Sequence, residues 1–109
     1  ALSNNVVKMN SKQRKQLHIA AVFACNFSNH MYSIADDLLA KKNIDFKILL
    51  PLIRKTNANL ENYRPKEVQT GPAKRKDTGI IQEHIATIKE NEIKELYHRI
   101  SDNIIKYHE

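Results

Sequence analysis

Two polar stretches stand out in a chain whose other segments carry apolar residues at helical spacing. One of them is QTGPAKRKD, Gln69 to Asp77, which joins a glycine–proline pair to a basic run and an aspartate. A glycine lets a partner approach the backbone closely, and the free N–H groups of a helix that starts at Asp77 favour anions. Gln69, Thr70 and Gly71, followed by the cation Arg75, therefore form a candidate cradle for a carboxylate or a phosphate. The alternative is a structural turn followed by a solvated basic run.

The other polar stretch is NFSNHMY, Asn26 to Tyr32, which lies inside an otherwise apolar helical segment. Burying an amide without a partner costs about 1–3 kcal/mol, so these groups must meet water, a ligand or other polar groups. Hydrogen bonds to neighbouring backbone, for example at residues 69–73, are one possibility. As a set, the residues favour a ligand-facing surface. At 100° per residue the following side chains fall within about 120° of one another: His18, Val22, Asn26, Asn29, His30 and Ser33.

Other site chemistries have weaker support. His18, Cys25 and His30 lack the tight spacing of metal ligands, and no second cysteine is present, so we expect no metal site. Cys25 lies in an apolar helical segment, where a thiolate is disfavoured, and it is not expected to act as a nucleophile. His84 falls on an apolar stripe, which is more typical of a core histidine with a satisfied hydrogen bond than of a catalyst.

The long helix predicted from Asn10 or Ser11 to about Lys42 must position the polar stripe. Its middle is apolar on nearly every side, which predicts burial. The remaining helices of so short a chain can hardly cover all these faces. We therefore expect something outside the chain to cover part of it.

Shorter helices are predicted to follow. Asn43 is expected to end the long helix and Asp45 to start the next, which Pro51 should kink or divide. Residues 65–77 are predicted to be the only substantial irregular stretch, followed by a helix to about residue 88 and a last helix after a joint at 89–91. The predicted fold class is all-α, a helical bundle around one long central helix.

Composition bounds the possible functions. A chain of 109 residues with 41% apolar and 28% charged residues is expected to form one ordinary globular domain. No apolar run approaches the roughly 20 residues that span a bilayer, so no membrane segment is expected. The single cysteine and the absence of a signal-peptide pattern at the N-terminus favour the cytoplasm. The net charge of +6 comes from scattered basic clusters, and nucleic-acid binding would rest on charge alone.

Three segments taken together resemble a known family. LHIAAVFACNFSNHMY, then DFKILLPLI, then QTGPAKRKD with His84 downstream is similar to the C-terminal helical domain, of unknown function, of bacterial Rossmann-like NADP oxidoreductases. The resemblance extends from about Ser11 to Ile105. These helical domains are in turn similar to the C-terminal domains of 6-phosphogluconate dehydrogenase, ketopantoate reductase and pyrroline-carboxylate reductase.

The resemblance implies a site and partners. In such proteins the long helix borders the cleft between the domains, so Asn26, Asn29 and His30 would face the nicotinamide and the substrate, with His18 nearby. Some relatives carry a lysine on this helix, which this stripe lacks, and the family pattern has an acidic residue where this chain has Lys55. The proton donor and the small-molecule substrate are therefore not assigned. A homodimer through the long helix is also implied.

The nucleotide site is expected to lie elsewhere. The chain has two glycines and no G-x-G-x-x-G, so NADP or NAD would be bound mainly by a preceding Rossmann domain that is absent from this chain. Residues 1–109 would then be a substrate-binding and dimerisation domain that is inactive alone. The alternative is a helical protein-interaction or self-association module without a small-molecule site, suggested by the apolar long helix.

Overall fold

Helices dominate the part of the chain that the computed structural model describes, residues 8–109, and no strand occurs among those residues. The prediction of an all-α fold is confirmed. Contacts divide the chain into two compact units, Ala1–Arg54 and Lys55–Glu109, and each is described by itself. The prediction of one domain over residues 1–109 stays a prediction.

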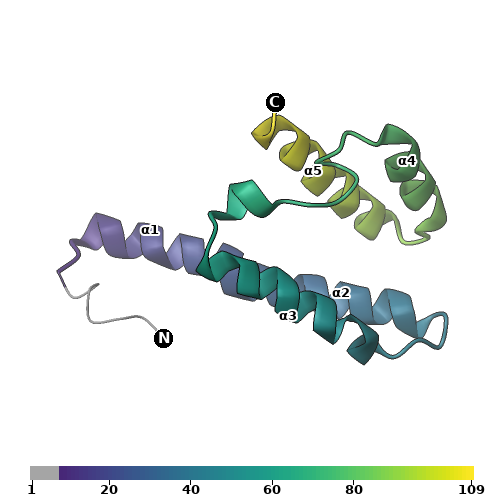
Figure 1. The fold of residues 1–109 in the computed structure, drawn as a ribbon, viewed down its shortest axis with the longest axis horizontal. Helices are drawn as coiled ribbons and strands as arrows, with labels where there is room; N and C mark the ends of the chain where they lie inside the picture. The colour runs from purple at the N-terminus through teal and green to yellow at the C-terminus, as the bar shows by residue number, and fades with distance from the viewer. Residues whose placement is uncertain (1–7) are drawn as a thin grey trace. The chain divides into compact units, whose positions relative to one another are not determined.

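The first unit contains the predicted long helix. Helix α1 (Ser11–Ala21), the π-helical segment η2 (Val22–Phe27) and α2 (Ser28–Ala40) follow one another without a break (Figure 1). A capping box starts α1, because Asn10 Oδ1 accepts from the Gln13 N–H at 2.8 Å and the Gln13 side chain accepts from the Asn10 N–H at 3.0 Å. Both bonds satisfy N–H groups that have no partner within the helix.

The predicted stop at Asn43 is confirmed. Its φ of 57° is left-handed, a conformation that asparagine tolerates better than most residues. The Asn43 N–H donates to the Ala40 carbonyl, and the Ile44 N–H donates to the Leu39 carbonyl, both at 3.0 Å. These bonds satisfy the last carbonyls of α2 and turn the chain around.

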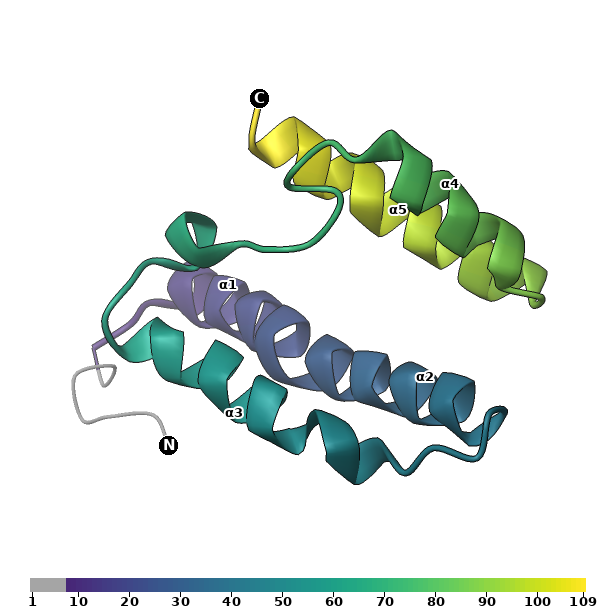
Figure 2. The same ribbon diagram turned by 45° about the vertical axis from the view of Figure 1, so that its right-hand side comes forward.

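After this turn the chain runs back beside the long helix (Figure 2). Asp45 caps the short 3-10 helix η3 (Phe46–Leu49), which leads into α3 (Leu50–Ala58). The predicted division at Pro51 is confirmed, since Pro51 lies in the first turn of α3, where a missing N–H costs nothing. Phe46 meets Tyr32 of α2 edge-on, with ring centroids 6.3 Å apart.

The second unit is a helical hairpin with a leading loop. Two 3-10 helices, η4 (Asn59–Glu61) and η5 (Pro65–Val68), precede α4 (Thr78–Thr87) and α5 (Asn91–Tyr107). The start of α4 is as predicted, since Asp77 Oδ1 accepts from the Ile80 N–H at 3.2 Å. The stretch predicted to be irregular, residues 65–77, contains one short 3-10 helix. Pro65, with its fixed φ, starts η5.

Burial is sparse in both units. Among the described residues only Ala73, Ile81 and Ser101 are buried, and all three belong to the second unit. The prediction that the long helix is buried is wrong for this chain by itself, because α1, η2 and α2 contain no buried residue. A single returning segment in the first unit cannot surround a helix that is apolar on most sides. The expectation that another body covers it stays a prediction.

One polar contact joins α4 to α5. The Nδ1 atom of His84 lies 2.7 Å from the Tyr97 hydroxyl oxygen, and the two rings meet nearly at right angles. His84 was predicted to be a core histidine, but it is exposed. It does have the expected hydrogen-bond partner. Desolvation raises the pKa of the Tyr97 hydroxyl above its ordinary value, which further favours the neutral hydroxyl.

Tyr97→Phe should destabilise the second unit by roughly 0.5–1.5 kcal/mol, because it removes this hydrogen bond and leaves the ring contact. Urea unfolding followed by circular dichroism measures the change. Tyr63→Phe is the matched control, since Tyr63 is 56% exposed, and it should be neutral. Equal stabilities for the Tyr97→Phe variant and the parent chain would show that the contact contributes nothing.

Candidate functional site

The polar stripe of the long helix is open to solvent in the first unit. The side chains of His18, Asn26, Asn29 and His30 are all exposed. The predicted cost of burying them therefore does not arise in this chain alone, because water can satisfy their polar atoms. Exposed amides and imidazoles on one helix face remain free to bind a ligand.

The stripe runs through a π-helical turn that the sequence did not predict. Residues Val22–Phe27 take i→i+5 bonding, which places one more residue in a turn than an α-helix does. The helix after this turn is therefore rotated back by about 100°, one α-helical step. His30, rather than Asn29, then falls nearest in line with His18, and Asn29 moves to the edge of the stripe. Single π-turns inside α-helices are frequent at functional sites.

The loop of the second unit is a compact turn. The Asp77 N–H donates to the Pro72 carbonyl at 2.9 Å, and the Lys76 N–H donates to the Ala73 carbonyl at 3.0 Å. The Ala73 side chain is 5% exposed, which anchors the middle of the turn. This geometry makes the Gly71–Asp77 backbone a fixed element rather than a slack connection.

The glycine in this loop has a conformational reason. Gly71 has φ +101°, which side-chain-bearing residues rarely adopt, while a Cβ atom there would meet nothing within 4 Å. The Gln69 side chain donates to the Thr70 carbonyl at 3.1 Å, and both residues are exposed. The loop therefore presents open backbone beside polar side chains, with the exposed cation Arg75 four residues on.

A basic cluster gathers three segments of the second unit. The Lys66 amino group lies 5.9 Å from the centre of the Tyr107 ring, a cation–π arrangement. Desolvation, then the charges of Lys74 and Lys66, hold the pKa of His108 below its ordinary value. Sequence reasoning missed this cluster, because only the packing of η5 and the loop against the end of α5 brings the three segments together.

The predicted site residues fall into two sets. His18, Asn26, Asn29 and His30 share one helix of the first unit, and Gln69, Thr70, Gly71 and Arg75 share one loop of the second. Each set is brought together by its own element, as predicted. The assignment of these residues to a ligand remains a prediction.

No group of three His, Cys, Asp or Glu residues within residues 8–109 is arranged to hold a metal ion. Within the same residues, none of the helices has the length and apolarity needed to cross a bilayer. Cys25, predicted to be buried, is exposed, because nothing in its unit covers that part of the helix.

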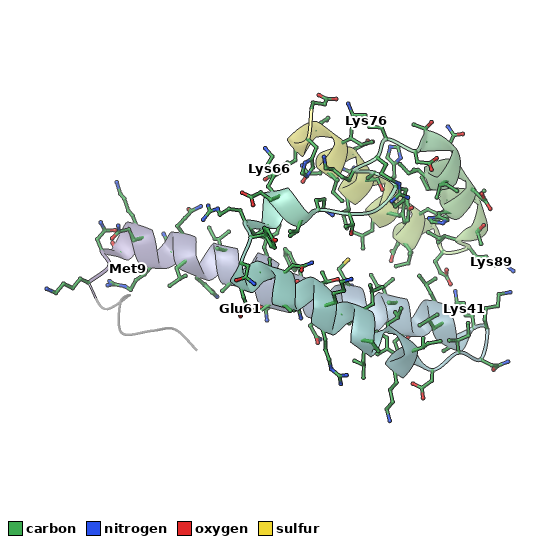
Figure 3. The ribbon with its side chains drawn as sticks, in the orientation of Figure 1. Met9, Lys41, Glu61, Lys66, Lys76 and Lys89 are labelled. Carbon is green, nitrogen blue, oxygen red and sulfur yellow. The ribbon has the colours of Figure 1, made fainter. Side chains whose placement is uncertain are left out.

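The basic cluster gives a titration that can be measured. Lys74→Gln should raise the pKa of His108 toward the ordinary value, because one of the positive charges that disfavour its protonated form is removed. NMR titration of the imidazole resonances measures this pKa. Lys89→Gln is the control. Lys89 (Figure 3) precedes the start of α5, whereas His108 follows the other end of that helix. A His108 pKa that does not respond to Lys74→Gln would contradict the proximity.

Comparison with known proteins gives both a family and a structural relative. The family described as Domain of unknown function (DUF2520) matches residues 1–104. A crystal structure described as a putative NADP oxidoreductase from Bacteroides fragilis has a similar fold, with a TM-score of 0.86 and 43% identity. The similarity covers 90% of this chain and 38% of that one, so the chain spans well under half the length of that relative.

No curated protein matches the chain. The family match and the structural likeness agree with each other in extent, and both support the predicted resemblance to the C-terminal helical domain of an NADP oxidoreductase. The chain therefore belongs to the DUF2520 family.

Proposed function

We propose that this chain is the cleft-forming, substrate-binding and dimerisation domain of an NAD(P)-dependent oxidoreductase. The observation that carries the proposal is an exposed polar stripe on a π-interrupted helix, in a chain similar to 38% of an NADP oxidoreductase. In this proposal a Rossmann domain of the same protein is the partner and binds most of the dinucleotide. The small-molecule substrate lies between that domain and the stripe, and the protein works in the cytoplasm.

The stripe supplies binding and orientation. Asn26 and Asn29 each offer an amide donor and an amide acceptor, and His18 and His30 each offer imidazole nitrogens. Such groups can hold a substrate carbonyl or hydroxyl in one orientation, which is the protein's part in hydride transfer. The hydride chemistry belongs to the nicotinamide.

The loop supplies a second binding element in this proposal. Arg75 can meet a carboxylate or a phosphate through its planar fork of donors, and the open backbone at Gly71 allows close approach. Asp77 already caps α4 by accepting from the Ile80 N–H, so that N–H is not available to a ligand. The loop therefore acts through Arg75, Gln69 and Thr70 rather than through the helix end alone.

The exposed apolar surface of the long helix supports a second candidate function. Phe23 is 65% exposed and Phe27 is 48% exposed, which favours a docking surface. A helical interaction module would need only this surface and not the polar stripe. The two functions differ in what the stripe does, which the following two experiments separate.

Asn29→Ala and Arg75→Ala should each weaken ligand binding by the whole gene product roughly three- to tenfold, the effect of losing one net hydrogen bond. Titration with NADPH, alone and with candidate carboxylate or phosphate substrates, measures the affinity. Gln16→Ala and Gln82→Ala are matched controls on exposed helix positions and should bind normally. Unchanged binding by both Asn29→Ala and Arg75→Ala would show that the cleft is assigned wrongly.

Phe27→Ala should shift the protein from dimer toward monomer, because it removes a large exposed ring from the proposed contact face. Sedimentation velocity over a concentration series measures the shift. Asn29→Ala should leave the oligomeric state unchanged. If Phe27→Ala alters association and no stripe variant alters ligand binding, the interaction module is the better description.

A further inference from the structure

We propose that the basic cluster of the second unit, Lys66, Lys74 and His108, binds a phosphate dianion, and that His108 takes up a proton from solvent as the anion binds. The site goes beyond the proposed function, because it shares no side chain with the polar stripe or with the loop residues assigned there to the substrate. Three observations carry it: cations from three segments lie together, no carboxylate pairs with them, and their backbone is fixed.

The cations come from segments that are distant in the sequence. Helix η5 carries Lys66 (Figure 3), whose amino group lies 5.9 Å from the centre of the Tyr107 ring in the last turn of α5. His108 follows as the C-terminal cap residue of α5, and the charges of both Lys66 and Lys74 act on its imidazole. Because charge interactions weaken with distance, the two amino groups lie near this imidazole.

No carboxylate pairs with the cluster. Within residues 8–109, none of the Asp or Glu side chains forms an ion pair with Lys66, Lys74 or His108. The carboxylate of Asp77 already accepts from the Ile80 N–H. Cations outnumber carboxylates among the other charged residues of the same three segments, which are Arg64, Glu67, Arg75, Lys76, Asp77, Lys106 and Glu109. A bound anion would supply the negative charge that the cluster lacks.

The backbone that carries these cations is fixed. The Asp77 N–H donates to the Pro72 carbonyl at 2.9 Å, and Ala73, next to Lys74, is buried. The Tyr107 ring holds the Lys66 amino group by a cation–π contact, which leaves ammonium hydrogens free to donate to an anion. Donors held in place lose less conformational entropy when they bind a ligand.

The charge of the cluster favours a dianion and couples its binding to a proton. Desolvation, then the charges of Lys74 and Lys66, hold the pKa of His108 below its ordinary value, which favours the neutral ring near neutral pH. A dianion beside the ring acts in the opposite direction and favours the imidazolium, so its binding raises the pKa of His108. By linkage, the affinity for the anion must rise as the pH falls through the titration of His108.

Inorganic phosphate, titrated into the whole gene product at about pH 8 and constant ionic strength, should shift the amide NMR resonances of residues 72–77. Lys66→Gln and Lys74→Gln should each weaken this binding roughly three- to fivefold, because each removes one exposed charge contact. Lys89→Gln, outside the cluster, should bind phosphate as the parent does. If neither cluster variant weakens binding, the site is wrong. If only Arg75→Ala weakens it, the anion lies at the loop residues of the proposed function instead.

Sulfate is the probe for proton uptake, because its own charge stays constant between about pH 6 and about pH 8, where histidine titrates. Its affinity should rise as the pH falls across this range in the parent and stay nearly constant in His108→Gln. His98→Gln is the control and should keep the rise, since His98 pairs with Asp102 outside the cluster. A rise that survives His108→Gln, or no rise in the parent, would overturn the role of His108.

The dianion has two possible sources, free inorganic phosphate and the phosphate group of a larger ester. Methyl phosphate distinguishes them in the same titration at about pH 8. Binding within about threefold of inorganic phosphate assigns the site to a phosphate ester, and a loss of more than about tenfold assigns it to the free ion. If neither anion shifts the resonances of residues 72–77, the cluster is not an anion site, while ligand binding by the polar stripe is judged by its own variants.

Discussion

The uncovered apolar surface of the long helix is the constraint on which the rest of this molecule depends. Removing apolar surface from water contributes about 25 cal/mol of free energy for each Å² buried. The first unit has only one short returning segment that can cover the long helix. Phe23, left 65% exposed, is the most exposed large apolar side chain of the long helix among the described residues. Among the described residues only Ala73, Ile81 and Ser101 are buried, so the core of the chain by itself is small. The prediction that another body covers part of the long helix follows from this small core.

The proposed function involves two kinds of partner, and they would use different faces of the long helix. The exposed apolar side chains of Ile19, Phe23 and Phe27 suit the proposed dimer contact, because a dry contact there gains free energy without leaving a polar group unpaired. The polar stripe at His18, Asn26 and His30 suits a wetter cleft with a ligand in it. One helix can serve both because the faces point in different directions. The π-turn shifts the stripe relative to its position in an uninterrupted α-helix.

The second unit is likewise held together by few buried residues. Its hairpin is held by the small core around Ile81 and by the His84–Tyr97 contact, and its loop is fixed by backbone hydrogen bonds and by the buried Ala73. A loop fixed in this way can present Arg75 to a ligand with little loss of conformational entropy on binding. Rigid elements with open polar side chains are suited to recognition.

Local chemistry let the sequence determine the helices and their ends. Asn43 tolerates a left-handed backbone, Asp77 caps with its own carboxylate, and Pro51 fits only a first turn, so each of these boundaries depends on residues within one turn of it. The sequence also placed the candidate site residues on one helix and in one loop, where the structure has them. The exposure of Cys25 and the cluster of Lys66 and Lys74 with His108 were decided by tertiary structure. These features depend on which segments pack together and on how much surface they leave open. The spacing of residues along one helix specifies neither.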